Sequence, residues 1–164
     1  LEDVAVSTVI ASDTPVIVER ALWWPNEPAS WYEAHNSPGT TATGQTWALG
    51  EGEVGGDNGF ETYVLLANTS AFAGTARVTL LFEDGSPSVS KDVALPANSR
   101  VNVPIGEADA VGGFGAAAQN KRFGVLVESL GAQPAAIVVE RAMYASQGSQ
   151  FWAAGTNALA ARVR

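Results

Sequence analysis

The sequence of 164 residues contains no cysteine and a single histidine, His35. Without cysteine the chain forms no disulfide and offers no thiolate to a metal. One histidine is too few for a zinc site built on imidazoles. A Ser-His-Asp triad also finds no Gly-x-Ser-x-Gly segment to accompany His35. We therefore expect no enzyme, no cofactor and no metal site of these kinds.

Basic residues are scarce as well, with nine Lys and Arg against 17 Asp and Glu and a net charge of -8. No basic stripe is available for a phosphate backbone, so we expect no nucleic-acid partner. No apolar run approaches the roughly 18 residues that span a bilayer, which argues against membrane insertion. The sequence starts at Leu1 without a signal peptide, and we expect a processed protein or a fragment of a longer array.

Apolar residues make up 46% of the chain and charged residues only 16%. The surface must therefore be built from Thr, Ser, Asn, Gly and Ala. This composition, together with the missing cysteines, favours a secreted or cell-surface bacterial protein.

Short runs rich in β-forming residues are dense along the chain. They alternate with turn segments such as Glu83–Ser86, whereas the Gly- and Ala-rich stretch 108–120 allows at most one weak helical turn near 116–118. Strands at this spacing predict an all-β protein with an antiparallel, immunoglobulin-like β-sandwich. The expected strands cover residues 4–10, 16–23, 46–49, 60–67, 76–82, 89–95, 100–105, 123–129 and 136–144.

The chain repeats itself with an offset of 121 residues, the difference between 140 and 19. An offset that holds over about 20 residues without a gap marks a repeated structural unit. We interpret the repeated residues as structural framework, because a catalytic pair would not need duplication. They are Glu19, Arg20, Trp31 and Asn36 and their counterparts Glu140, Arg141, Trp152 and Asn157.

The repeat divides the chain into three parts. Residues 1–43 supply the end of a preceding copy, 44–144 form a complete sandwich module, and 145–164 start the next copy or close the chain. Alternatively, the first strands complete the same sandwich, which then has nine or ten strands. We expect one compact body, because an isolated two-stranded hairpin is marginal in water.

Several segments carry a family resemblance, among them Val-Glu-Arg-Ala-Met-Tyr at 139–144, Trp-Tyr-Glu-Ala-His-Asn-Ser-Pro-Gly at 31–39 and Phe-Trp-Ala-Ala-Gly-Thr-Asn-Ala at 151–158. The chain resembles a repeat module of about 120 residues carried by large secreted or surface proteins of acidobacteria, actinobacteria and related environmental bacteria. The resemblance covers nearly the whole chain and implies an extracellular β-sandwich array. It implies no activity and no catalytic residues.

Residues 50–55 match Gly-x-Gly-x-x-Gly, but Glu51 and Glu53 would repel a pyrophosphate and no helix can open after Gly55. We interpret residues 51–61 as a flexible acidic loop. Its oxygen donors leave calcium binding open as an alternative to a solvated loop.

Trp23, Trp24, Trp31 and Tyr32 form the densest aromatic cluster. Two interpretations are open. The aromatics fill a seam between modules, or Trp24, Trp31 and Tyr32 bind a partner or stack on sugar rings.

The sequence therefore predicts a non-catalytic structural or adhesive module whose partners are neighbouring copies or other surface proteins. A terminal strand that completes the sheet of the next subunit would extend such modules into a filament. The alternative is a carbohydrate-binding module accessory to a larger extracellular protein.

Overall fold

The computed structural model describes residues 5–26, 29–108 and 111–164, and for residues 25, 26 and 29–32 it describes the backbone alone. Within these residues the chain forms eleven strands and one turn of 3-10 helix. They are β1 (Glu19–Asn26), β2 (Ala29–Pro38), β3 (Thr46–Val54), β4 (Glu61–Asn68), β5 (Gly74–Phe82), β6 (Val89–Leu95), β7 (Ser99–Pro104), η1 (Gly115–Ala117), β8 (Lys121–Ser129), β9 (Ile137–Gln147), β10 (Gln150–Leu159) and β11 (Ala161–Arg162).

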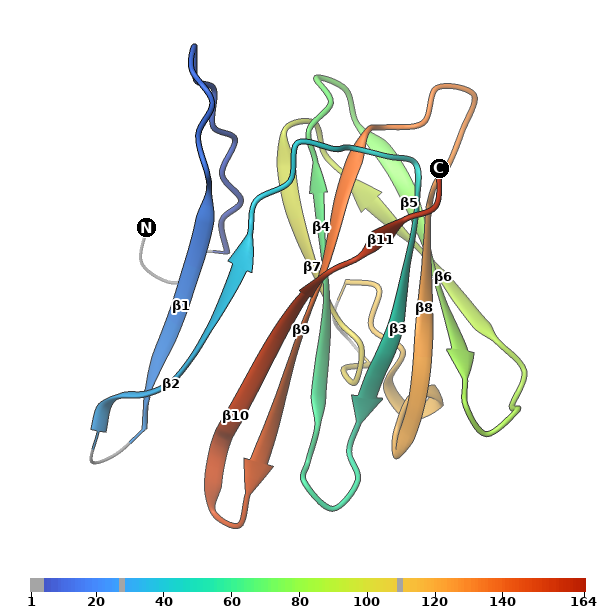
Figure 1. The fold of residues 1–164 in the computed structure, drawn as a ribbon. Helices are drawn as coiled ribbons and strands as arrows, with labels where there is room; N and C mark the ends of the chain where they lie inside the picture. The colour runs from blue at the N-terminus through green and yellow to red at the C-terminus, as the bar shows by residue number, and fades with distance from the viewer. Residues whose placement is uncertain (1–4, 27–28, 109–110) are drawn as a thin grey trace.

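Two antiparallel sheets pack face to face (Figure 1). One has the strand order β10-β9-β4-β7 and the other the order β11-β3-β8-β5-β6. In the part of the chain that the structure describes, β1 and β2 pair only with each other, in a third, two-stranded sheet. The predicted all-β antiparallel sandwich is therefore confirmed.

The core between the two sheets follows from period-two alternation along the strands. In β5, Val78 and Leu80 are fully buried, whereas Arg77 and Thr79 on the opposite face bond to Asp92 and Ser90 of β6. This division of β5 into two faces is the one that its sequence predicts. Strand β8 does the same with Phe123, Val125 and Val127, which face the buried side of β4 and β9.

The immunoglobulin-like part of the prediction is not confirmed, because two strands exchange places. In an immunoglobulin domain the first strand lies beside the second, and the last lies beside the one before it. Here β3, the first strand of the sandwich, pairs with β8 and not with β4, and β9, the seventh strand counted from β3, pairs with β4 and not with β8. Strands β10 and β11 are added at the edges of the two sheets.

Four details of the sequence interpretation need correction. Residues 5–10 form no strand. Residues 50–54 are not a flexible loop but continue β3, which is irregular between Leu49 and Gly52. Two further strands lie outside the expected strand ranges: β2, which contains His35, and β10, which lies within the segment 145–164. For residues 50–54, β2 and β10, Gly or polar residues suggested a loop, whereas pairing with a neighbouring strand satisfies the backbone.

Candidate functional site

The first two strands are a structural copy of β9 and β10. When 121 is added to the residue number, β2 spans the same residues as β10, and β1 corresponds to residues 140–147 of β9, which begins three residues earlier at Ile137. The register is also the same, since Glu19 lies opposite Pro38 as Glu140 lies opposite Leu159. Both hairpins have their irregularity at the same place, where three residues of the second strand lie opposite one residue of the first.

One backbone hydrogen bond at the open end of each hairpin repeats as well. The amide of Gly39 donates to the carbonyl of Val18 at 2.8 Å, and the amide of Ala160 donates to the carbonyl of Val139 at 2.9 Å. The offset seen in the sequence is therefore an offset between two equal hairpins.

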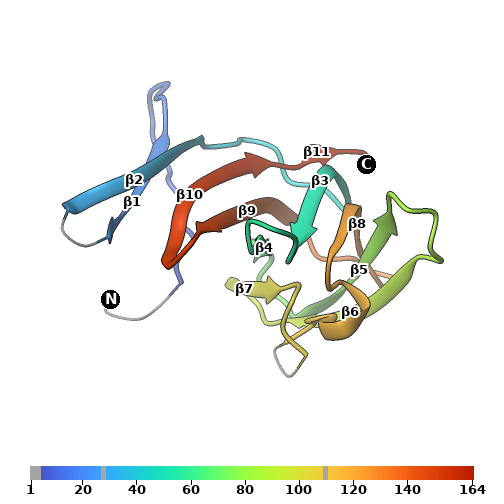
Figure 2. The same cartoon turned by 90° about the horizontal axis from the view of Figure 1, so that it is seen from below.

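The first hairpin packs on the second one. Strand β2 lies against β10, and β1 lies on the far side of β2 (Figures 1 and 2). One face of the first hairpin, with Arg20, Trp24, His35 and Ser37, is at least partly covered, whereas Glu19, Ala21, Ala34 and Asn36 on the other face are exposed. The covered face rests on the outer face of the β10-β9-β4-β7 sheet.

Trp24 makes the central contact between the two hairpins. Its indole meets the ring of Tyr144 edge to face, with 5.3 Å between ring centroids, and its Nε1 donates to the carbonyl oxygen of Trp152 at 2.9 Å. Gly155 provides the room, since a Cβ there would lie 2.6 Å from the Trp24 ring and 2.7 Å from the Tyr144 ring. Aromatic pairs of this geometry add about 1 kcal/mol beyond the area that they bury.

Further aromatic residues extend the cluster across the sheet. Tyr144 stacks on Trp152 at 4.4 Å, and Tyr63 meets both rings edge to face. Glu61 accepts hydrogen bonds from the Tyr63 hydroxyl at 2.7 Å and from Trp152 Nε1 at 3.2 Å. Burial, followed by the bond to Glu61, raises the pKa of Tyr63.

Trp152 has a left-handed backbone with a φ of 50°. A large side chain is rarely found there, and the conformation costs of order 1–3 kcal/mol. It lies where β10 bulges, which directs the indole onto Tyr144.

Charged residues border the aromatic cluster. Arg20 forms an ion pair with Glu140, the counterpart of its own neighbour Glu19, at 3.3 Å. Burial lowers the pKa of Arg100 on β7, and the nearby Arg20 lowers it further. The Arg100 guanidinium also donates to the backbone carbonyl of Val6.

His35 lies between these charges and the aromatic rings. Its ring is 5.7 Å from that of Trp24 and 6.2 Å from that of Tyr144. Both ring nitrogens are buried without a hydrogen-bond partner among the described residues. Burial and, next, the charge of Arg20 lower the pKa of His35.

The repeated framework residues have unequal surroundings in the two copies. Arg141 is buried on the side facing the other sheet and bonds to Glu51 at 3.0 Å, whereas Arg20 is partly exposed on the outer side of the sandwich. Asn157 is covered and its side chain has no partner among the described residues, while Asn36 is exposed. The prediction for Trp31 and Tyr32 falls on side chains outside the described residues.

The sequence reasoning missed Tyr63 and the contact role of Tyr144, and it placed Glu61 in the acidic loop without its bonds to Tyr63 and Trp152. Tyr144 carried a signal, because it is the counterpart of Trp23 and alternation places it on the outer face of β9. Gly155 carried another, as a glycine inside an aromatic-rich strand marks a close approach.

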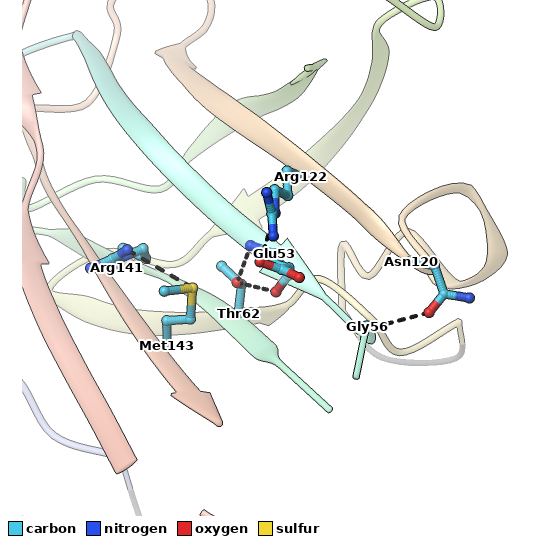
Figure 3. Close-up of polar contacts among 7 residues, drawn as sticks. All are labelled: Glu53, Gly56, Thr62, Asn120, Arg122, Arg141 and Met143. Carbon is cyan, nitrogen blue, oxygen red and sulfur yellow. Dashed lines mark hydrogen bonds and ion pairs between the residues drawn. The ribbon is translucent and has the colours of Figure 1, made fainter. Parts of the chain in front are cut away.

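The acidic segment forms part of an open cleft of about 550 Å³ at the ends of β3, β8 and β9. Two of its acids are engaged, since Glu51 pairs with Arg141 and Glu53 pairs with Arg122, each at 3.0 Å. Figure 3 shows the pair of Glu53 and Arg122. Glu53 is also fixed through its backbone, whose amide and carbonyl both bond to the Thr62 hydroxyl. Across the described ranges no group of three or more His, Asp or Glu could hold a metal ion.

Fold and site together define a two-sheet antiparallel β-sandwich that carries a second copy of its own β9-β10 hairpin. No protein-family model matches the chain, and no curated protein matches it. The fold is similar to the crystal structure of Thermotoga maritima 1070, with a TM-score of 0.58 and 15% sequence identity. That similarity covers 73% of this chain and 94% of the other and concerns the fold alone.

Within the described part of the chain, no helix has the length and the apolar character that crossing a membrane requires.

Proposed function

We propose that this protein is a non-catalytic structural module of a secreted or cell-surface bacterial protein, arranged end to end with further copies of itself. The observation that carries the proposal is the junction at Trp24, where the hairpin of one copy packs on the equivalent hairpin of the next. Neighbouring copies are then the principal partners of the module.

The chemistry of the junction supports a fixed orientation between copies. Trp24 is held by a hydrogen bond and by the Tyr144 ring, and Arg20 is held by Glu140. The hydrogen bond and ring packing of Trp24 form one contact, and the ion pair of Arg20 forms another. Together they restrain both the position and the rotation of the hairpin on the sandwich. A module that transmits its orientation in this way serves as a rigid spacer.

Nitrogen-15 relaxation of the backbone amides in the intact chain tests this function. We expect the β1-β2 hairpin to tumble with the sandwich as one body. Replacing Trp24 by Ala should release the hairpin, because a half-buried indole contributes about 2 kcal/mol or more. Glu19→Ala is the control on the same strand, since Glu19 is exposed on the other face of the hairpin and its loss should leave the hairpin docked.

A hairpin that tumbles independently in the unchanged chain would contradict the rigid-spacer function. A sandwich that unfolds in the Trp24→Ala variant would place Trp24 in the folding core instead. Amide spectra of β3–β8 distinguish these results from release of the hairpin alone.

The alternative is a carbohydrate-binding module, and one observation favours it. Phe151 is exposed at 60% and stacks on Trp152 at 5.0 Å, which gives sugar rings an accessible aromatic surface. Screening the chain on a glycan array tests this alternative. A specific signal that Phe151→Ala removes while the fold survives would favour the carbohydrate module over the spacer.

A further inference from the structure

Strand β1 has an open edge. It pairs with β2 on one side, and no strand in the described ranges pairs with its other side. An open edge presents unpaired amide and carbonyl groups that can accept another strand.

The second copy of the hairpin shows what belongs at that edge. There the corresponding edge of β9 is paired along its length with β4, from Glu61 opposite Tyr144 to Asn68 opposite Ile137. The two hairpins share register and bulge, and β1 corresponds to residues 140–147 of β9, so the same pairing fits β1 without a change in its backbone. Residues 16–18, which precede β1, would then become strand like their counterparts 137–139.

The direction of the backbone groups agrees with this. In β9 the carbonyl of Val139 points to the β10 side, and the carbonyl of Ala136 points to the β4 side. Since alternate residues of an antiparallel strand point to opposite neighbours, Glu140 and Ala142 direct their amides to β4. Their counterparts Glu19 and Ala21 therefore direct theirs to the open edge of β1.

The residues just before the first hairpin also lack the neighbours that bury their counterparts. Val127 and Ile137 are fully buried in the complete copy, whereas their counterparts Val6 and Val16 are exposed at 47% and 57%. Exposed valines at positions that are core in the equal copy indicate a missing layer.

We propose that the open edge of β1 pairs with the strand equivalent to β4 in another sandwich of this same kind. The β1-β2 hairpin then completes that sandwich as β9-β10 completes this one. This inference rests on the proposed function and names the contact between copies. The register is defined: the partner's counterpart of Glu61 lies opposite Trp23, and its counterpart of Asn68 lies opposite Val16. The bond from Arg100 to Val6 is given up when residues 5–9 join that sandwich.

The partner is a sandwich whose place beside β4 is vacant. A second copy of this chain does not offer one, since its own β4 is already paired on both edges, with β9 and with β7. A sandwich that precedes β1 on the same polypeptide offers such a place, because β1-β2 would be the only hairpin to pair with its equivalent of β4.

An extended chain provides the test. Residues 44–124 are placed directly before Val4, which keeps the 121-residue spacing, and hydrogen exchange is followed at single amides. We expect exchange at Glu19 and Ala21 to slow by about 100-fold relative to the original chain. Arg20 and Leu22, whose amides face β2, are the internal controls and should be protected in both chains.

A proline variant provides a second measurement. Ala21→Pro removes an amide that faces the open edge in the original chain and should change its melting temperature little. In the extended chain the same substitution should destabilise the added sandwich, because it then removes a bond inside a sheet.

Two results would overturn the proposal. One is an added sandwich that stays unfolded, since the same residues fold beside an equal hairpin in the second copy. The other is a folded extended chain in which Glu19 and Ala21 exchange as fast as before. Neither result depends on whether the hairpin docks through Trp24 or whether the chain binds glycans, so failure of the spacer function remains distinguishable.

Discussion

Gly155 shows how one missing methyl group makes the junction possible. Ala at this position would place a Cβ within 2.7 Å of both the Trp24 and the Tyr144 rings. We expect Gly155→Ala to displace Trp24 and to cost about 1–3 kcal/mol, the usual range for overpacking. Thermal unfolding and the near-ultraviolet circular dichroism of the tryptophans measure the loss.

Gly50→Ala is the control for that substitution, because the space around Gly50 is empty within 4 Å. Its effect should stay within about 0.5 kcal/mol. Equal stability of the two variants would mean that Trp24 does not pack on Gly155 in solution.

We expect His35 to make the contact between the two hairpins sensitive to pH. Burial and the Arg20 charge lower the pKa of its imidazole in the folded protein, so the unfolded chain takes up a proton first as the pH falls. Stability contributed by the neutral ring is therefore complete above about pH 6.5 and decreases as the pH falls towards 5. Glu140 opposes the shift but is the smaller influence.

We expect the melting temperature of the chain to decrease between pH 7 and pH 5 and this decrease to be smaller in His35→Gln. Glutamine retains a polar side chain but does not titrate. An identical pH profile in both proteins would show that other groups, such as the carboxylates, cause the decrease.

At the scale of the element, the two hairpins form a natural matched pair. Ala21 and Ala142 occupy equal positions, but the amide of Ala21 faces an open edge and that of Ala142 faces β4. Proline is tolerated at an edge and disrupts a central strand. We expect Ala142→Pro to cost about 3 kcal/mol or more and Ala21→Pro less than about 1 kcal/mol.

Chemical denaturation of the two proline variants measures this difference directly. A large loss from Ala21→Pro would mean that the edge of β1 is already occupied in the isolated chain. Comparable small losses would mean that β9 is not held by β4.

For the whole molecule, the division into three sheets predicts what can be removed. Among the described residues no strand of the sandwich pairs with β1 or β2, so deleting residues 1–38 leaves the ladders of the two large sheets intact. We expect this variant to fold with a melting temperature lower by roughly 5–15 °C, because it loses the packing of Trp24.

The same deletion should uncover Tyr144 and Trp152 and increase the binding of a hydrophobic dye. Circular dichroism and dye fluorescence check the two expectations together. A variant without cooperative unfolding would show that the hairpin belongs to the folding unit of the sandwich.

Local sequence patterns determined much of the fold. Alternation along residues such as 77–82 assigned strands and their two faces, since each side chain of a strand points opposite to the next. The 121-residue offset identified Glu19 and Arg20 as counterparts of Glu140 and Arg141. The Gly-rich segments led to a wrong prediction of loops, because β3 and β10 obtain their conformation from neighbouring strands and not from local preference.

What the sequence alone determined is therefore the all-β composition and the equivalence of two segments. The neighbours of each strand, such as the exchanged places of β3 and β9, follow only from the folded structure. The same holds for the pairing of Arg20 with Glu140 and the packing of Trp24 on Gly155. Alternation defines the faces of a strand but contains no information about its partner. A repeat shows that two segments are alike, whereas contact between them depends on distant residues that meet only in the folded chain.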